Sequence, residues 1–372
     1  MTRQTADFLV VGGGPAGCAF AMLAARAGAS VILAERTDYS AKRPGEHLTG
    51  RIRPLLDQLG VAKPALSGLA EPSAGIVSLW SSESLPLMKV YRAMGARMAI
   101  ATVRHRFDEM LSDAAASAGV TVLRDTSLAA IDRNRRPQWH ATLRRADGSA
   151  VDCDARAVVD ASGRSATIAR RQGTRRLNYG DLMAIVCWLE LDQPSERAGT
   201  PLTVESCPYG WWSISTGHSL AVATLYTTST IMKASRLSAA RLWQVALDST
   251  TQARELTSAR GIARRDLRVF PAAPSRATQV VGDGWISIGD AAVTLDPLGG
   301  QGVAFALDTA FRAFEAACVD PTWNALGDTY RDALTDRFER HLAGRADVYA
   351  QAAGVLSESF LDAAVPRASL VS

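Results

Sequence analysis

The stretch FLVVGGGPAG, residues 8–17, decides the fold that the sequence predicts. Its first four residues form a short apolar run, which predicts a strand buried on both faces. The alanine-rich run at 16–27 predicts a helix, and a second β-prone run at 30–33 leads to Glu35. A strand, a tight turn, a helix and a strand predict a βαβ unit, so a parallel sheet is expected to begin near the N-terminus.

Three glycines of this stretch satisfy the pattern GxGxxG between the strand and the helix, namely Gly12, Gly14 and Gly17. In a dinucleotide-binding unit the first glycine makes the turn, the second lets a pyrophosphate approach the backbone, and the third lets helix and strand pack closely. The anion lies at the helix N-terminus, and a carboxylate about 20 residues further on binds the ribose. Glu35 occupies that place. The pattern therefore favours dinucleotide binding over a purely structural turn.

A second glycine-rich corner lies near the end of the chain. Gly289 and Asp290 follow an apolar run at 285–288 that predicts a buried strand, and a predicted helix begins at about Gly302. The loop between them offers backbone N–H groups at a helix N-terminus, which suit the N1–C2=O edge of a reduced isoalloxazine, and the Asp290 carboxylate suits ribityl hydroxyls. NAD alone would not need this corner, so the sequence favours FAD. The alternative is an ordinary capped helix.

The chain between the two corners changes its pattern. Residues 178–280 contain longer alternating runs with Thr and Trp, which predict an antiparallel sheet that faces the substrate. Residues 323–361 have helical spacing and predict outer helices. We find no repeats or linkers and expect two interleaved domains in an α/β fold: an FAD-binding domain at 1–75, 100–177 and 280–320, a substrate domain at 76–99 and 178–279, and a C-terminal helical region at 321–372.

The composition is that of a folded, globular chain. The 372 residues are 47% apolar and 21% charged, and the net charge of +4 is too small to indicate a nucleic-acid-binding surface. The five cysteines form no CxxC pair and the five histidines form no HExxH motif, so neither a disulfide framework nor a metal site is expected. Glycines and Arg26 interrupt the apolar run at 8–33, which argues against a membrane span, and a reducing cytoplasm fits best.

These motifs make the chain similar, nearly end to end, to the superfamily of FAD-dependent monooxygenases and tryptophan-halogenase-like flavoproteins. Three segments carry the resemblance: residues 11–17 with Glu35-Arg36, DASGR at 160–164, and the run from Gly289-Asp290 to Gly302. It implies a Rossmann-type, glutathione-reductase-like FAD domain of the para-hydroxybenzoate hydroxylase type. Four shorter runs resemble the branch of flavoproteins that modify tryptophan in forming quinone cofactors: GEHL at 45–48, residues 75–80, RHRFD at 104–108 and GWW at 210–212.

The resemblance also implies which residues would hold FAD. Gly12, Gly14, Ala16 and Gly17 would hold the pyrophosphate, Glu35 the adenosine ribose and Arg36 the adenine side. Arg104 would lie near the flavin, and Leu128 would touch adenine through its backbone. Asp290 would bind the ribityl chain or the pyrophosphate, with Pro297, Gly300, Gln301 and Gly302 along the ring.

Bound FAD would perform the hard chemistry, while the protein would orient the reactants and exclude water. The resemblance implies a monooxygenase that hydroxylates an aromatic ring through a flavin C4a-hydroperoxide. Trp80, Trp211 and Trp212 would form an aromatic wall for this reaction, although each is equally well explained as a core residue. Glu46 and His47 would be catalytic, because a histidine with an ordinary pKa of about 6.5 can move a proton. The alternative for both is a structural role.

The resemblance says less about the substrate and the electron donor. It implies a small-molecule or a peptide- or carrier-bound aromatic substrate, tryptophan-derived in the branch named above, with O2 as co-substrate. NAD(P)H is expected to reduce the flavin, yet residues 170–280 contain no second strand-coupled GxGxxG. NAD(P)H would therefore visit the flavin transiently or act through a separate flavin reductase.

Three alternative functions stay open. The related halogenases carry a catalytic lysine in a TFK-like strand, whereas Lys89 lies in the run LMKV without that context. Flavin-dependent reductases of isolated double bonds share the region around Gly289-Asp290. The third alternative is a flavin-binding partner that assists the maturation of another protein without turnover.

Overall fold

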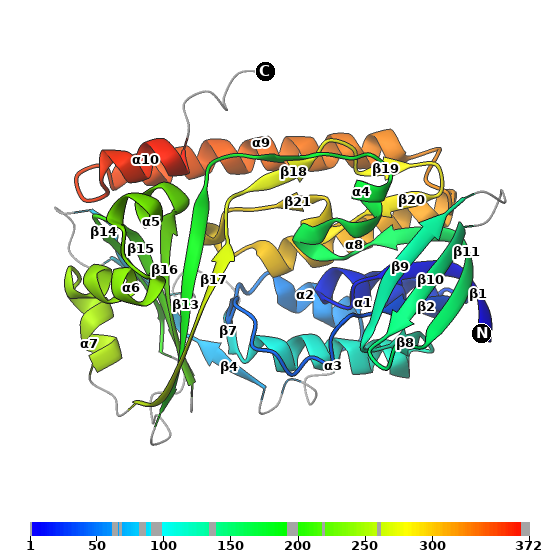
Figure 1. Cartoon of the computed structure of the whole chain (residues 1–372), viewed down its shortest axis with the longest axis horizontal. Helices are drawn as coiled ribbons and strands as arrows, with labels where there is room; N and C mark the ends of the chain where they lie inside the picture. Colours follow the sequence, from blue (N-terminus) through cyan, green and yellow to red (C-terminus); the bar gives the residue numbers. More distant parts are fainter. Residues whose placement is uncertain are drawn as a thin grey trace.

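The computed structural model describes residues 2–61, 66, 69–81, 87–90, 99–133, 139–191, 200–217, 220–258 and 262–365. Parts of the predicted substrate domain lie outside the described residues, namely 82–86, 91–98, 192–199, 218–219 and 259–261. The described chain forms two large sheets, joined by small sheets and bridged by long C-terminal helices (Figure 1).

The N-terminal βαβ unit is confirmed. Strand β1 (Thr2–Val11) leads through α1 (Pro15–Arg26) to β2 (Val31–Ala34), and the two strands pair in parallel. The parallel sheet continues to β8 (Thr121–Leu123) on one side, and to β11 (Ala150–Asp160) and β20 (Trp285–Ser287) on the other. The short β19 (Val281–Gly282) pairs antiparallel with β20.

Strand β1 is longer than the apolar run at 8–11 that predicted it. Residues 2–6 of β1 also pair with 151–155 of β11. This pairing was not predicted, because residues 2–6 are mostly polar and do not resemble a buried strand.

Alternate residues of β1 serve two different cores. Phe8 and Val10 pack in the core formed with α1, α3 (Arg104–Ser117) and α8 (Gly302–Val319). Leu9 and Val11 point to the opposite face, which is covered by residues of β9 (Thr126–Asp132), β10 (Trp139–Arg145) and α4 (Thr167–Arg171). The parallel sheet therefore lies between a layer of helices and an antiparallel meander.

The second large sheet is the one predicted to face the substrate. Its order is β17 (Ile262–Pro271), β13 (Leu182–Leu191), β16 (Leu220–Thr228), β15 (Gly210–Thr216), β14 (Leu202–Cys207), β5 (Gly75–Leu79) and β6 (Leu87–Val90). All neighbours are antiparallel except β14 and β5, which pair in parallel. Three helices beside this sheet were not predicted from the sequence: α5 (Ser229–Ser235), α6 (Ala239–Asp248) and α7 (Gln252–Ser258).

Short elements connect the two large sheets. One small sheet contains β3 (His47–Leu48), β7 (Ala99–Thr102) and β4 (Ala70–Ser73), and helix α2 (Ile52–Gln58) follows β3. Another contains β12 (Arg176–Asn178), β18 (Ser275–Ala277) and β21 (Val293–Thr294). Three 3₁₀ turns lie at the predicted motifs: η2 (Gly163–Ser165), η3 (Gly289–Ala291) and η4 (Pro297–Gly299).

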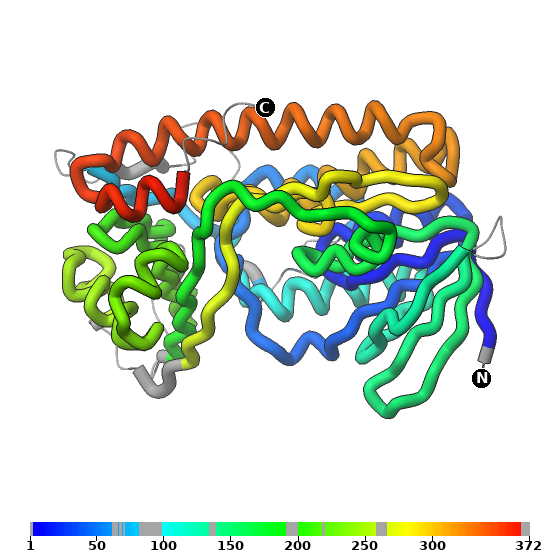
Figure 2. Tube along the Cα trace, turned by 45° about the horizontal axis from the view of Figure 1, so that its top comes forward, coloured from blue at the N-terminus to red at the C-terminus, as the bar shows by residue number. Residues whose placement is uncertain are grey.

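The C-terminal helices span the molecule. Helix α9 (Gly327–Gln351) runs from the parallel sheet to the second sheet, where α10 (Glu358–Ala364) follows it (Figure 2). Among the residues that the structure describes, none of the helices combines the length and apolar character needed to cross a bilayer. The predicted α/β fold class is confirmed, while the domain boundaries stay a prediction.

Candidate functional site

The three glycines of the first motif have the three different environments that the pattern predicts. Gly12 has φ +111°, and a Cβ there would lie 2.3 Å from the carbonyl oxygen of Ala161. A Cβ at Gly17 would lie 1.9 Å from the carbonyl oxygen of Gly12, so helix and strand can pack only without it. A Cβ at Gly14 would meet no atom within 4 Å. Turn and packing thus explain the outer glycines, and only Gly14 borders open space, where a pyrophosphate can approach the backbone.

The three motifs of the sequence meet at one end of the parallel strands. The backbone N–H of Ala161 donates to Val11 (2.9 Å), and that of Ile288 donates to Asp160 (2.9 Å). A Cβ on Gly289 would lie 3.0 Å from the Cβ of Ala16, so the two glycine corners are neighbours. Ligands of open α/β sheets bind at this end of the strands.

The second corner resembles the first in its geometry. Gly300, with φ +58°, turns the chain out of η4, and α8 begins at Gly302, where a Cβ would again meet nothing within 4 Å. Helix α1 packs against α8, so two helix N-termini with open glycines lie in the same part of the molecule. The positive ends of both helix dipoles suit an anionic group.

Asp290 supplies a carboxylate at this second corner. No described residue donates a hydrogen bond to its side chain, which leaves both oxygens available to ligand hydroxyls. Burial raises the pKa of Asp290, and the positive charges of Arg164, Arg176 and Arg104 oppose that rise. Open glycines, two helix N-termini and a free carboxylate fit an FAD molecule that spans both corners.

Glu35 organises the chain after β2. Its Oε2 accepts from the backbone N–H of Gly13 (2.7 Å), and its Oε1 accepts from the N–H (3.1 Å) and the hydroxyl (2.6 Å) of Thr37. Arg43 Nη2 also donates to Oε1 (3.3 Å), so the described chain itself supplies four donors to this carboxylate, about as many as it can accept. Contact of Glu35 with the adenosine ribose stays a prediction. Arg36, predicted beside the adenine, is exposed.

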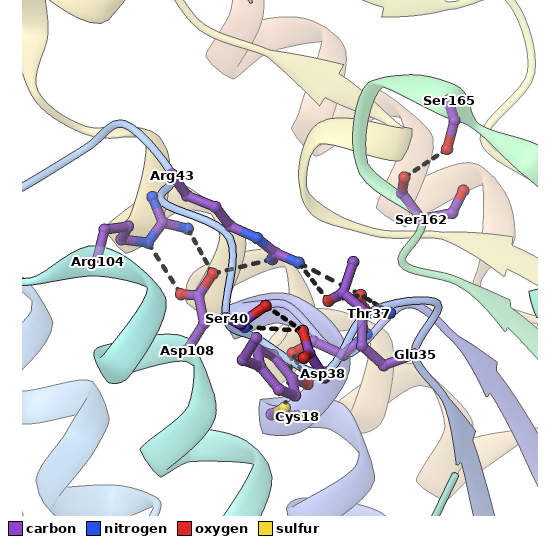
Figure 3. Close-up of polar contacts among 12 residues, drawn as sticks. Cys18, Glu35, Thr37, Asp38, Ser40, Arg43, Arg104, Asp108, Ser162 and Ser165 are labelled. Atoms are coloured by element: carbon purple, nitrogen blue, oxygen red, sulfur yellow. Dashed lines mark hydrogen bonds and ion pairs between the residues drawn. The ribbon is translucent and has the colours of Figure 1, made fainter. Parts of the chain in front are cut away.

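Arg43 and Arg104 converge on one buried carboxylate (Figure 3). Asp108 has no exposed side-chain surface, and it receives Arg43 Nη1 at 3.2 Å and Arg104 Nε at 2.9 Å. Arg43 also lies 3.3 Å from Glu35, and Arg104 Nη1 donates to the carbonyl of Pro44 (3.2 Å). The sequence analysis did not single out Arg43. Asp108 was quoted only as part of RHRFD, although its four-residue spacing from Arg104 was a visible signal.

Leu128, predicted to contact adenine, is a buried residue of β9. Its carbonyl accepts from Arg171 Nη2 (3.2 Å). Thr126, at the start of β9, contacts the residue that follows β2: its N–H donates to the carbonyl of Glu35 (2.8 Å). The role of Leu128 toward adenine stays a prediction.

Glu46 lies between the FAD corner and the second sheet. Its Oε2 accepts from the N–H of Gly45 (3.0 Å), and its Oε1 accepts from the indole Nε1 of Trp188 in β13 (3.2 Å). Burial raises the pKa of Glu46 to about 7, although these hydrogen bonds and the charge of Arg104 act in the opposite direction. A carboxyl group with this pKa can gain or lose a proton near neutral pH.

Trp188 was not predicted as a site residue, because its partner Glu46 lies 142 positions away in the chain. Phe270 packs edge-on against its ring at 6.1 Å between centroids, and Arg268 lies 5.9 Å above it. Both neighbours come from β17, which pairs with β13. The indole that orients Glu46 is therefore held by the second sheet.

His47 does not have the ordinary pKa assumed in the sequence analysis. Burial lowers the pKa of His47 to about 4, so the ring is neutral at pH 7. Its Nε2 lies 3.1 Å from the hydroxyl of Ser73 in β4. A neutral ring bonded to a neighbouring strand can orient the loop, but the protonated imidazolium that could act as a general acid is scarcely populated near neutral pH.

The three predicted tryptophans do not form a single wall. Trp211 stacks on Tyr226 with 3.9 Å between ring centroids, and Trp80 lies edge-on to Trp211 at 6.2 Å. Trp212 packs edge-on against Trp243 of α6 at 5.1 Å. Consecutive residues of a strand point to opposite faces, so Trp212 faces away from Trp211. The expectation of one wall is therefore corrected to a cluster of Trp80, Trp211 and Tyr226.

The loop at 296–301 brings the remaining predicted residues together. Asp296 is buried and caps η4, because its Oδ1 accepts from the N–H of Leu298 (2.9 Å). Pro297 begins this turn, and the Gln301 side chain accepts from Arg337 Nη2 (3.0 Å). Among the described residues, no group of His, Cys, Asp and Glu side chains could hold a metal ion.

Comparison with known proteins gives relatives over most of the chain. A protein named as an FAD-dependent oxidoreductase, LodB of Marinomonas mediterranea, is 29% identical over 322 residues, which cover 85% of this chain and 86% of that protein. A tryptophan 2-halogenase of Chondromyces crocatus is 24% identical over 317 residues, covering 83% of this chain and 60% of the halogenase.

Solved structures share the fold at lower identity. The flavin-dependent halogenase CmlS aligns with a TM-score of 0.86 and 22% identity over 98% of this chain and 68% of that chain. The peptidyl tryptophan dihydroxylase QhpG aligns with a TM-score of 0.75 and 23% identity over 94% of this chain and 76% of that chain.

The match that decides the family is to a model of an FAD binding domain, and it covers residues 5–330. That range includes all three predicted motifs and both glycine corners described above. The chain belongs to the FAD binding domain family, and it is an FAD-dependent oxidoreductase.

Proposed function

We propose that the chain is a monooxygenase that hydroxylates an electron-rich aromatic ring, with a tryptophan side chain in a peptide or carrier-bound precursor as the first candidate. The observation that carries the proposal is the placement of Glu46. Its carboxyl group has a pKa of about 7 and lies between the arginine that borders the FAD corner and an indole of the second sheet.

Each group of residues has a part in this proposal. The open glycines at 14 and 302 and the Asp290 carboxylate hold FAD, which supplies the redox chemistry, with O2 as the oxidant and NAD(P)H as the donor, directly or through a separate reductase. Trp211, Tyr226 and Trp188 provide apolar surface that excludes water. Glu46 holds or takes the proton that the substrate ring must lose when oxygen is added.

The domain boundaries belong to the same proposal. Residues 1–75, 100–177 and 280–320 bind FAD, residues 76–99 and 178–279 face the substrate, and residues 321–372 form the helical region. The two large sheets support this division, because each has its own buried core.

Halogenation is the second candidate. A relative over 83% of this chain is named a tryptophan 2-halogenase, although the chain spans only 60% of it. Lys89, the residue considered in the sequence analysis, lies in β6 and pairs with Ile76 of β5. If the chain is a halogenase, replacing Lys89 by Met is expected to abolish halide-dependent product.

Mass spectrometry separates the candidates. The purified protein is incubated with FAD, a flavin reductase, NADH, O2 and a tryptophan-containing peptide, with and without bromide. We expect a product heavier by oxygen that does not depend on bromide. A brominated product would establish the halogenase, and no product with the peptide would favour a maturation partner. In a parallel incubation with a prenyl substrate, two added hydrogens would indicate a double-bond reductase.

A further inference from the structure

Helix α9 presents a row of polar side chains to the loop at 296–301. The row consists of Arg337, His341, Arg345 and Tyr349, which are spaced four residues apart and so lie along one side of the helix. The adjacent row, Tyr330, Leu334, Phe338 and Leu342, is buried in the core of the parallel sheet. The members of the polar row do not belong to this core, so apolar packing does not explain their place on the helix.

Two members of the row bind the ends of the loop. Arg337 Nη2 donates to Gln301 Oε1 (3.0 Å), next to the start of α8. His341 Nε2 accepts from the backbone N–H of Asp296 (2.8 Å). Burial, aided by the charges of Arg345 and Arg337, lowers the pKa of His341 to about 4, so the ring stays neutral and Nε2 remains an acceptor.

The other two members bind the Asp296 side chain. Arg345 Nη1 lies 3.7 Å from Asp296 Oδ2, and both side chains are almost fully buried. The hydroxyl of Tyr349 donates to the same Oδ2 (3.3 Å). Since Oδ1 caps η4, one carboxylate ties the turn to α9.

Tyr349 also reaches the second sheet. Its hydroxyl oxygen accepts from the indole Nε1 of Trp211 (2.9 Å), and Trp211 stacks on Tyr226. The ring of Tyr349 packs against Trp80 at 6.0 Å and Phe360 at 5.8 Å. A single buried hydroxyl thus connects the loop at the FAD corner with the aromatic cluster of the other sheet.

We propose that Tyr349 is a positioning residue that fixes the 296–302 loop relative to the aromatic cluster, and hence the flavin ring relative to the substrate. The proposal rests on the proposed function for the place of the flavin ring along this loop. Tyr349 lies beyond residues 5–330, which match the family model, whereas its partners Asp296 and Trp211 lie within them. Neither end of the connection is a surface group, because Tyr349, Trp211 and Asp296 are all buried.

The test is hydrogen exchange of the FAD-loaded protein, read by mass spectrometry on the segment 297–302. Tyr349→Phe keeps the ring and removes the hydroxyl, and we expect about tenfold faster exchange in this segment, because a buried hydrogen bond that holds the loop is lost. Exchange in 9–17 is expected to stay unchanged. The visible absorption spectrum and the reduction potential of bound FAD are expected to shift in the same variant.

A matched control lies on the same helix. The hydroxyl of Tyr330 is also buried and donates to the carbonyl of Ser287 (2.8 Å), so Tyr330→Phe removes one buried hydrogen bond without touching the loop. Asp296→Asn is the second test variant and is expected to speed exchange in the same segment. The proposal is overturned if Tyr349→Phe leaves 297–302 unchanged, or if Tyr330→Phe changes it equally. None of these readouts requires turnover, so the result stands whether or not hydroxylation is observed.

Discussion

The proton on Glu46 is controlled by its immediate surroundings. Burial favours the neutral acid, whereas the Gly45 N–H, the Trp188 indole and the Arg104 charge favour the carboxylate. Because the opposing contributions leave the pKa at about 7, both forms are populated near neutral pH. This balance is the property that a general acid or base needs, and His47, the other titratable residue of the GEHL run, does not have it.

The first prediction concerns activity. Glu46→Gln removes the titrating proton and keeps an acceptor for Trp188, so we expect product formation to fall about 100-fold or more, with FAD affinity changed less than about threefold. Wild-type turnover is expected to rise with pH around 7, as the carboxylate forms. This rise in turnover is expected to be absent from the pH profile of the variant. Steady-state rates between pH 5 and pH 9 at saturating flavin check both statements, and an unchanged rate would reduce Glu46 to a structural residue.

Thermal unfolding of the same variant provides the control for folding. A carboxyl group whose pKa is raised on folding stabilises the protein below its unfolded pKa, and this stability is lost as the pH rises through about 7. The glutamine side chain of the variant carries no charge at any pH. We therefore expect the variant to unfold at a higher temperature than the wild type at pH 8, and the difference to shrink toward pH 5.

The second prediction separates the glycines of the first motif. Gly14 has an extended backbone, φ −74° and ψ −177°, and open space at its Cβ position, so Gly14→Val is expected to fold normally and to lose FAD. Gly17→Ala brings a methyl group against the Gly12 carbonyl, so this variant is expected to lose thermal stability even without FAD. Flavin content and unfolding temperature of the apoproteins check the pair. Normal FAD binding by Gly14→Val would show that the FAD pyrophosphate does not lie against this loop.

At the scale of single elements, helix α3 shows how the chain after β2 is anchored. Asp108 is fully buried and compensates two guanidinium groups, Arg43 from the loop and Arg104 from its own helix. On the exposed side of the same helix, Asp113 pairs with Arg124 but keeps 67% of its side chain exposed. The two carboxylates differ in burial while sharing the helix, so they form a natural pair of test sites.

The third prediction uses that pair. Asp108→Ala leaves two positive groups without the anion between them, and we expect the free energy of unfolding to fall by about 3 kcal/mol. Asp113→Ala breaks an exposed ion pair and is expected to cost less than about 1 kcal/mol. Urea denaturation measures both. Equal losses would mean that Asp108 does not anchor the loop that carries Glu46.

Elements also show what the sequence could predict. The βαβ unit and its glycines were predictable because turn, strand and helix are encoded within about 30 neighbouring residues. Helices α5, α6 and α7 were missed because each is short, and the Ser and Thr residues around their ends also fit loops. Trp212 was assigned to the wrong side because the repeated Trp suggested one surface, whereas strand alternation separates neighbours.

For the whole molecule, the site residues that the sequence left unidentified are those whose partners come from distant parts of the chain. Trp188 meets Glu46 across 142 positions, and Tyr349 meets Trp211 across 138. Neither contact has a local signature, because each depends on how a distant segment, the loop before β3 or helix α9, packs against the second sheet. The motifs predict where FAD binds, whereas tertiary packing decides which side chains lie around that place.

The fourth prediction tests whether FAD joins the two corners. If FAD spans them, its binding must slow hydrogen exchange at 12–17 and at 289–302 together, although these segments lie far apart in the sequence. At a free FAD concentration of about 100 times the dissociation constant, exchange that requires FAD release is expected to slow about 100-fold. Helix α6, which lies in the core of the second sheet, serves as the internal reference and is expected to change little. Protection of residues 12–17 alone would leave FAD at one corner and remove the basis for placing its ring beside Glu46.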